Sequence, residues 1–250
     1  MPAAISQQSR LSELFAVDAM EPATKRARVE VKPFQQLDLD KFSLKVNLSK
    51  KDGKTYYNSL IDGASFLFNL TPEPTSWLDT PFGFDTSGKY EQPSFLGGNE
   101  PDVEGKTEGL SLRLNLQPEQ AEFLSKLDGA AQKAFADVAT ATWAPLVAED
   151  SFHNSPVCKV MVALKGANLT KLTIVHNDEV TCGAGWDFLK KFLVGCNDFR
   201  RAEVKLSVKV QKVYNVAKKA GMKLEATQMV LRINKPVEED VFADHAALLA

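Results

Sequence analysis

The clearest hydrophobic pattern in the chain is a strict alternation of apolar and polar residues that begins near Arg200. The apolar positions fall on one side of an extended chain and are Ala202, Val204, Leu206, Val208 and Val210. The other side carries Arg201, Glu203, Lys205, Ser207, Lys209 and Gln211. A turn with Lys218, Lys219 and Gly221 follows, and then a second extended run, 222–233. The second run brings Lys223 back beside the first run. The pattern predicts a long β-hairpin with one apolar face for a core and one cationic face for a partner.

Earlier segments repeat the alternation and predict more strands. Residues 42–48 place Phe42, Leu44, Val46 and Leu48 on one side. Asp-Gly pairs at 52–53 and 62–63 are strong turn signals, so 42–48, 56–61 and 64–70 are expected to form a three-stranded meander. The run 110–116 alternates in the same way and predicts a further strand.

Two segments have a helical rather than a strand period. Pro118 suits the first position of a helix, and apolar residues keep a helical spacing from Phe123 to Trp143, across a helix expected to reach about Thr142. Residues 186–193 form a short amphipathic pattern. Between these helices we expect a loop at 149–156 and two strands, 157–164 and 171–176, around a turn at 166–168.

The order of these elements predicts a mainly β protein with a few helices (α+β class). Strand, strand, short helix, strand, strand is the order expected of part of a small Greek-key barrel, which the earlier strands complete. We expect a flexible arm at 1–34, one barrel domain at 35–236 with an insertion at 71–150, and an acidic tail at 237–250. Because the stretch 71–109 is rich in Pro, Gly and aromatic residues, it is expected to be functional rather than simply disordered.

Composition supports a soluble intracellular protein. The chain has 250 residues, of which 44% are hydrophobic and 25% charged, which is ordinary for one large domain or two small ones. No stretch approaches the roughly 20 apolar residues of a membrane span, and no secretion signal is expected, so no membrane partner is predicted. Three cysteines without a CxxC spacing indicate free thiols in a reducing compartment.

Charge is distributed unevenly along a chain whose net charge is only -2. From Arg200 to Lys223 there are eight Lys or Arg residues and one Glu. The final segment, 237–250, carries acids and no Lys or Arg. Such a tail either competes with nucleic acid for a cationic groove and recruits replication or recombination proteins, or only aids solubility. In the arm, Lys25, Arg26 and Arg28 form either a nuclear-import signal or a solvated basic cluster.

The sequence offers little for catalysis. It contains no GxSxG, P-loop, HExxH or strand-associated GxGxxG motif, and only three histidines. A zinc site drawn from Cys158, His176, Cys182 and Cys196 matches no common finger spacing. Cys158 and Cys196 lie in apolar sequence contexts and are better interpreted as core residues. We therefore expect a protein that is not an enzyme and that uses no metal or cofactor.

Binding of single-stranded nucleic acid is better supported, because it needs a cationic surface for phosphates and aromatic faces for bases. The hairpin cations are Arg200, Arg201, Lys205, Lys209, Lys212, Lys218, Lys219 and Lys223. Neighbouring strands and the short helix add Lys159, Lys165, Lys171, Lys190 and Lys191. Candidate stacking residues are Tyr214, Tyr56, Tyr57 and Trp77, whereas Phe66, Phe68, Phe123 and Phe135 are assigned to the core. The alternative for each is a solvated lysine or a core aromatic.

The segment 156–236 resembles the oligonucleotide-binding (OB) barrel of single-stranded-DNA-binding proteins from tailed phages and large nucleocytoplasmic DNA viruses. The resemblance rests on SPVCKVMVALKG, TKLTIVH, WDFLKKFL and AEVKLSVKVQKVYNVAKKAGMKLEATQMVL, and on KFSLKVNLSKKDGKTYYNSLI earlier in the chain. It implies an OB-like barrel that coats single-stranded DNA in replication, recombination or repair. The implied binding face includes Lys205, Lys209, Tyr214, Lys218, Lys219 and Lys223. The tail departs from the phage pattern, since it ends Ala-Leu-Leu-Ala.

Several alternatives stay open at this point. A viral capsid or nucleocapsid subunit with a β-sandwich body would also suit the basic arm and the long loop. RNA is an alternative ligand, and the sequence leaves a homo-oligomer open. The nucleus and a viral replication site are the two locations considered.

Overall fold

The predicted hairpin is the longest feature of the computed structural model. Strands β13 (Glu203–Val216) and β14 (Lys219–Ile233) pair antiparallel along their whole length, and Lys218 adopts a positive φ of 66° at the turn. The hairpin prediction is therefore confirmed, with one difference. Lys219 and Gly221 lie inside β14, opposite Val216 and Tyr214, and not in the turn.

The structure describes residues 29–48, 55–71, 73, 77–81, 84–85, 109–136, 142–150, 155–177, 179–193, 202–216 and 218–233. All strands of these segments belong to one mixed sheet, accompanied by two α-helices and two short 3₁₀ turns, η1 (Phe34–Gln36) and η2 (Leu39–Lys41). The predicted class, mainly β with a few helices, is confirmed. Neither helix in this part of the chain is long and apolar enough to cross a membrane.

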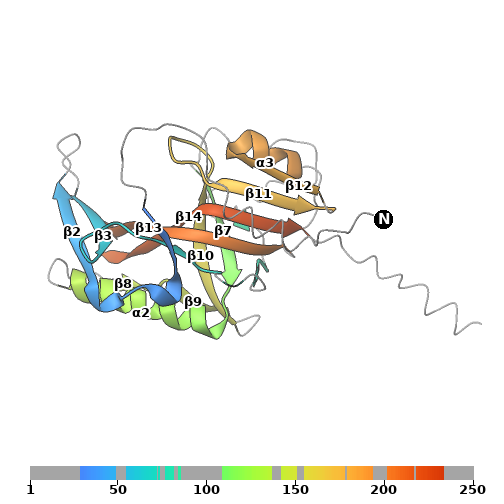
Figure 1. The fold of residues 1–250 in the computed structure, drawn as a ribbon. Helices are drawn as coiled ribbons and strands as arrows, with labels where there is room; N and C mark the ends of the chain where they lie inside the picture. The colour runs from blue at the N-terminus through green and yellow to red at the C-terminus, as the bar shows by residue number, and fades with distance from the viewer. Residues whose placement is uncertain are drawn as a thin grey trace, which may run out of the picture.

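Strand β14 organises one side of the sheet. Along one edge it pairs in parallel with β8 (Thr142–Ala144), β10 (Ser155–Ala163) and β11 (Lys171–His176) in turn. Strand β10 continues to β7 (Gly109–Asn115) and β9 (Val147–Asp150), and β7 to β6 (Phe84–Asp85). Strand β12 (Glu179–Ala184) pairs with β11. Figure 1 shows this long strand crossing the middle of the molecule.

Strand β13 organises the other side. It pairs with β3 (Thr55–Ile61), β4 (Leu67–Asn69) and β5 (Leu78–Asp79), while β1 (Val31–Pro33) pairs with β4 and β2 (Phe42–Leu48) with β3. The pairs formed by the described strands branch and do not close into a ring. Closure into an OB-like barrel therefore stays a prediction.

Helix α2 (Pro118–Phe135) begins at Pro118, as predicted, and supplies much of the core. Its apolar stripe is buried and includes Phe123, whose ring centroid lies 5.3 Å from that of Phe68. At its start, the Gln120 amide donates to the carbonyl of Leu70 at 3.3 Å, which ties the helix to the end of β4. The helix lies at the same end of the molecule as β2, β8 and β9, whereas α3 (Gly185–Leu193) lies beside β11 and β12 (Figure 1).

Several boundaries differ from the sequence prediction because long-range pairing overrode local pattern. The predicted meander is wrong at its third strand, since β4 pairs with β1 and β13. The helical spacing that reached Trp143 is misleading, because Trp143 lies in β8. The two strands expected around the turn at 166–168, β10 and β11, each pair with β14. Strands β9 and β12 were not predicted. Residues of β9 and β10 occupy part of the loop expected at 149–156.

Two of the predicted chain divisions contain sheet strands. Three residues of the predicted arm form β1, and Phe34 next to them is buried. The predicted insertion, 71–150, contributes β5 to β9 and α2 to the same sheet and core. The predicted acidic tail, 237–250, lies outside the described residues.

Candidate nucleic-acid interface

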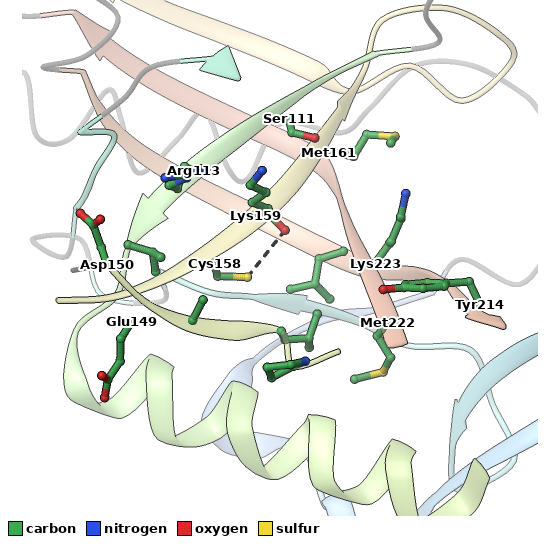
Figure 2. Close-up of a pocket in the computed structure, with 15 residues that line it drawn as sticks. Ser111, Arg113, Glu149, Asp150, Cys158, Lys159, Met161, Tyr214, Met222 and Lys223 are labelled. Atoms are coloured by element: carbon green, nitrogen blue, oxygen red, sulfur yellow. Dashed lines mark hydrogen bonds between the residues drawn. The ribbon is translucent and has the colours of Figure 1, made fainter. Parts of the chain in front are cut away.

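Four cationic side chains form a row across neighbouring strands. Arg113 on β7 is paired directly with Lys159 on β10, and Lys212 on β13 with Lys223 on β14. The two pairs are adjacent, because the residues after Lys159 and Lys223 are themselves paired between the parallel strands. Since strands lie about 4.8 Å apart, the row extends roughly 14 Å. Figure 2 shows Arg113, Lys159 and Lys223 pointing to the same side of the sheet.

Tyr214 lies one step along the strands from this row. The Lys223 ammonium is 5.8 Å from the centre of the half-buried Tyr214 ring. The tyrosine faces Gly221 on β14, where a Cβ atom would come within 2.8 Å of both the Tyr214 hydroxyl oxygen and the Ala144 carbonyl oxygen. Gly221 therefore leaves the space that lets the ring lie close to β14.

Arg113, Lys159 and Lys223 of this row border, together with Tyr214, an open groove of about 500 Å³ (Figure 2). Its floor comes from β7, β10 and β14, and one wall from the β8–β9 segment. Apolar side chains that line the groove include Pro145, Leu146, Met222 and Leu224, and Met222 lies near Tyr214 in Figure 2. Glu149 and Asp150 border the opposite end and offset part of the positive charge. The groove thus joins a cationic strip to a partly apolar recess beside an aromatic ring.

The β8–β9 wall is held by a buried carboxylate on α2. Asp128 is 7% exposed, and its Oδ1 accepts from Trp143 Nε1 at 2.9 Å, while its Oδ2 accepts from the backbone N–H of Leu146 at 3.3 Å. Burial raises the pKa of Asp128, and the two hydrogen bonds oppose this effect. Burial, with a smaller effect of the Asp128 charge, raises the pKa of the Cys158 thiol to about 12.

The middle of the predicted cationic face is neutralised. Lys209 lies directly opposite Glu225, with 2.6 Å between Lys209 Nζ and Glu225 Oε1. Glu225 is itself buried, so this ion pair is an internal contact of the hairpin and engages Lys209 within the fold. The exposed cations of the hairpin lie nearer its turn and are Lys212, Lys218, Lys219 and Lys223.

The other end of that face is covered, so the expectation of exposure is wrong for Lys205. This lysine is 7% exposed, its Nζ donates to the Glu73 carbonyl at 3.3 Å, and its ammonium lies 4.8 Å from the centre of the Trp77 ring. The Arg232 guanidinium lies 3.9 Å from the same ring and pairs with Glu203 at 2.9 Å. Burial, followed by the positive charge of Arg232, lowers the pKa of Lys205. The Trp77 ring therefore contacts two cations of the fold, so it is not a free ring on which a base could stack.

The remaining predicted residues lie away from the groove or outside the described part. Lys218 and Lys219 are exposed at the hairpin turn, and Lys165, Lys171 and Lys191 are exposed in the loop after β10, on β11 and on α3. Tyr57 packs on Phe135, with ring centroids 5.0 Å apart. No side-chain placement is described for Arg200, Arg201, Lys190, Tyr56, or for the import residues Lys25, Arg26 and Arg28.

Sequence reasoning missed Arg113, although its signal was present. The alternation of 110–116 buries four leucines and puts Arg113 on the opposite side, as the structure shows. The proposed zinc set is not assembled: Cys158 is buried in the core and Cys182 is exposed on β12, while Cys196 lies outside the described residues. No group of three potential metal ligands is found in the part of the chain that the structure covers.

Comparison with known proteins gives distant structural likenesses. No family model matches the chain, and no curated protein matches it. One similar solved structure is gp2.5, a single-stranded DNA binding protein encoded by bacteriophage T7, with 12% identity, coverage of 72% of this chain and 94% of that chain, and a TM-score of 0.33. Another is a single-stranded DNA-binding protein from bacteriophage Enc34 in complex with ssDNA, with 8% identity, coverage of 58% and 77%, and a TM-score of 0.33. At these scores the likenesses do not assign a function.

Proposed function

We propose that this protein binds single-stranded DNA without catalysis, along the groove bordered by Arg113, Lys159, Lys223 and Tyr214. The observation that carries the proposal is the row of four cations formed by two like-charged cross-strand pairs. Like charges directly opposite one another destabilise a sheet. The exposed Lys212 and Lys223 form such a like-charged pair at one end of the row. Phosphates placed over it would relieve the repulsion and release counterions.

The recess beside the row suits a nucleobase. Tyr214 offers an aromatic ring next to Lys223, and the wall residues Pro145 and Leu146 give the recess an apolar side. Stacking of a base on an aromatic side chain contributes about 1–3 kcal/mol, and it tolerates any base because each has a π-face. The combination favours binding of an unpaired strand with little sequence preference.

A role in replication, recombination or repair extends this proposal and rests on the sequence resemblance stated above. In that role the protein coats exposed single strands and the acidic tail recruits other proteins of the process. Fewer hairpin cations are left for the ligand than the sequence suggested, since Lys205 and Lys209 are engaged within the fold.

Fluorescence anisotropy with a labelled oligo-dT tests the proposal. Affinity should fall with salt with a logarithmic slope of about −2.8 if four phosphates are neutralised on a single strand. Changing Lys159 and Lys223 to Glu should abolish binding, whereas changing the exposed Lys165 and Lys191 to Glu is the charge-matched control. Absence of binding at micromolar wild-type protein would refute the proposal. Tighter binding of oligo-U of equal length would identify RNA as the ligand instead.

A further inference from the structure

Asp128 fastens both ends of a four-residue segment that forms one wall of the groove. The side chain of Trp143 and the backbone N–H of Leu146 each donate to a different oxygen of this buried carboxylate. Ala144 and Pro145 lie between these two points. A helix on the core side of the molecule therefore fixes the wall through two hydrogen bonds.

The fastened segment is also next to Tyr214. Ala144 pairs with Gly221 on one edge of β14, and Tyr214 faces Gly221 from the other edge. The Ala144 carbonyl oxygen and the Tyr214 hydroxyl oxygen each lie 2.8 Å from the position that a Cβ atom of Gly221 would take. The space available to the tyrosine ring is thus bounded by the segment that Asp128 holds.

We propose that Asp128 is a positioning residue for base binding: it sets the distance between the 143–146 wall and the Tyr214 ring, and so the width of the base recess. This inference rests on the proposed function. It gives the recess the role of holding one base of the bound strand against the Tyr214 ring. Asp128 touches no ligand and acts through Trp143, Leu146 and Tyr214.

A carboxylate suits this position better than its amide. The site has two N–H donors that meet two separate oxygens. In Asp128→Asn one of these oxygens becomes an NH₂ group, which cannot accept, so one donor loses its partner. Trp143→Phe is the complementary change, since it keeps an aromatic ring beside Phe135 and removes only the Nε1–H donor.

The test compares binding of oligo-dT with binding of an abasic deoxyribose-phosphate polymer of the same length. Tyr214→Ala should weaken oligo-dT binding on the order of tenfold, as expected for loss of one stacked base. Asp128→Asn and Trp143→Phe should each weaken oligo-dT binding by a similar or smaller factor and leave the abasic polymer unaffected. In the Tyr214→Ala background, Asp128→Asn should cause no further loss. Circular dichroism identifies any variant that fails to fold, and the other variant then carries the comparison.

The outcomes separate the two proposals. Equal weakening toward both polymers, or unchanged oligo-dT affinity in a folded variant, would overturn the positioning role while leaving single-strand binding intact. Additive losses from Asp128→Asn and Tyr214→Ala would also overturn it. Wild-type protein that binds neither polymer would overturn the proposed function and this inference with it.

Discussion

Lys223 on β14 lies directly opposite Lys212 on β13, and both side chains are exposed. A like-charged pair at such a position costs stability, while an opposite pair contributes about 0.2–1 kcal/mol. Two steps along the same strands, Lys209 meets Glu225 in the favourable arrangement. The hairpin thus contains both arrangements on one face, and Lys223 of the unfavourable pair borders the groove.

Exchanging the charge at Lys212 should therefore separate stability from binding. Lys212→Glu creates an opposite-charge pair with Lys223, so the free energy of unfolding should rise by about 0.2–1 kcal/mol. Affinity for oligo-dT should fall, because one phosphate contact is lost and a negative charge is added. Urea unfolding and anisotropy measure the two effects. Lys165→Glu is the control, and a variant that is both less stable and fully active would contradict the expectation.

Gly221→Ala should damage the tyrosine site without changing any charge. The added methyl group would lie 2.8 Å from the Tyr214 hydroxyl oxygen and the Ala144 carbonyl oxygen, so one of them must move. Overpacking of this kind costs about 1–3 kcal/mol. Affinity for oligo-dT should fall together with stability.

Gly129→Ala is the matched control for that change. Gly129 lies within α2, and nothing is within 4 Å of the Cβ position. Alanine there should increase stability by about 0.5–1 kcal/mol with no effect on binding, because it raises helix propensity. Thermal unfolding of the two variants gives opposite shifts if the space at Gly221 is as tight as described.

Trp77→Ala should affect stability and leave the binding mode unchanged. The ring contacts both the Arg232 guanidinium and the Lys205 ammonium, and each such contact contributes about 0.5–2 kcal/mol. The free energy of unfolding should fall by about 1–3 kcal/mol, and the salt slope of oligo-dT binding should stay the same. Trp77→Phe should lose less stability. A selective loss of affinity in a fully stable Trp77→Ala protein would show instead that the ring stacks on a base.

Alkylation should distinguish the two described thiols. The Cys158 thiol has its pKa raised to about 12 by burial, so at pH 8 only about one molecule in 10⁴ carries the reactive thiolate. Cys182 is exposed on β12. Iodoacetamide at pH 8 followed by peptide mass spectrometry should label Cys182 quickly and Cys158 only after unfolding in urea. Equal labelling rates in the folded protein would contradict the burial of Cys158.

The alternation in the sequence was enough to place the hairpin and the inward side of β7. Residues 110–116 alternate so regularly that four leucines had to share one side, and the structure buries all four. The turn at Asp62-Gly63 was also predictable, since both residues take the positive φ that an Asp-Gly turn favours. These features depend on neighbours in the chain, which a local pattern records.

Strict alternation failed where a bulge changed the side of a residue. Continued from Lys209, it puts Val213 on the cationic side and Lys212 on the apolar side. The register shift between Val210 and Lys212 leaves Gln211 as the extra residue, so Lys212 faces Lys223 on the cationic side and Val213 is buried. A bulge arises from pairing with the neighbouring strand, and the sequence of one strand does not record it.

The sequence by itself thus determined that this protein has a long two-faced hairpin with many cations and a leucine-lined neighbouring strand. The tertiary structure decided which cations are exposed at a groove. Lys205 is covered by Trp77 and Lys209 is neutralised by Glu225, whereas Lys223 is joined by Arg113 and Lys159 from distant strands. The physical reason is that alternation fixes the side from which a side chain leaves its strand, while the contacts on that side come from segments far away in the chain.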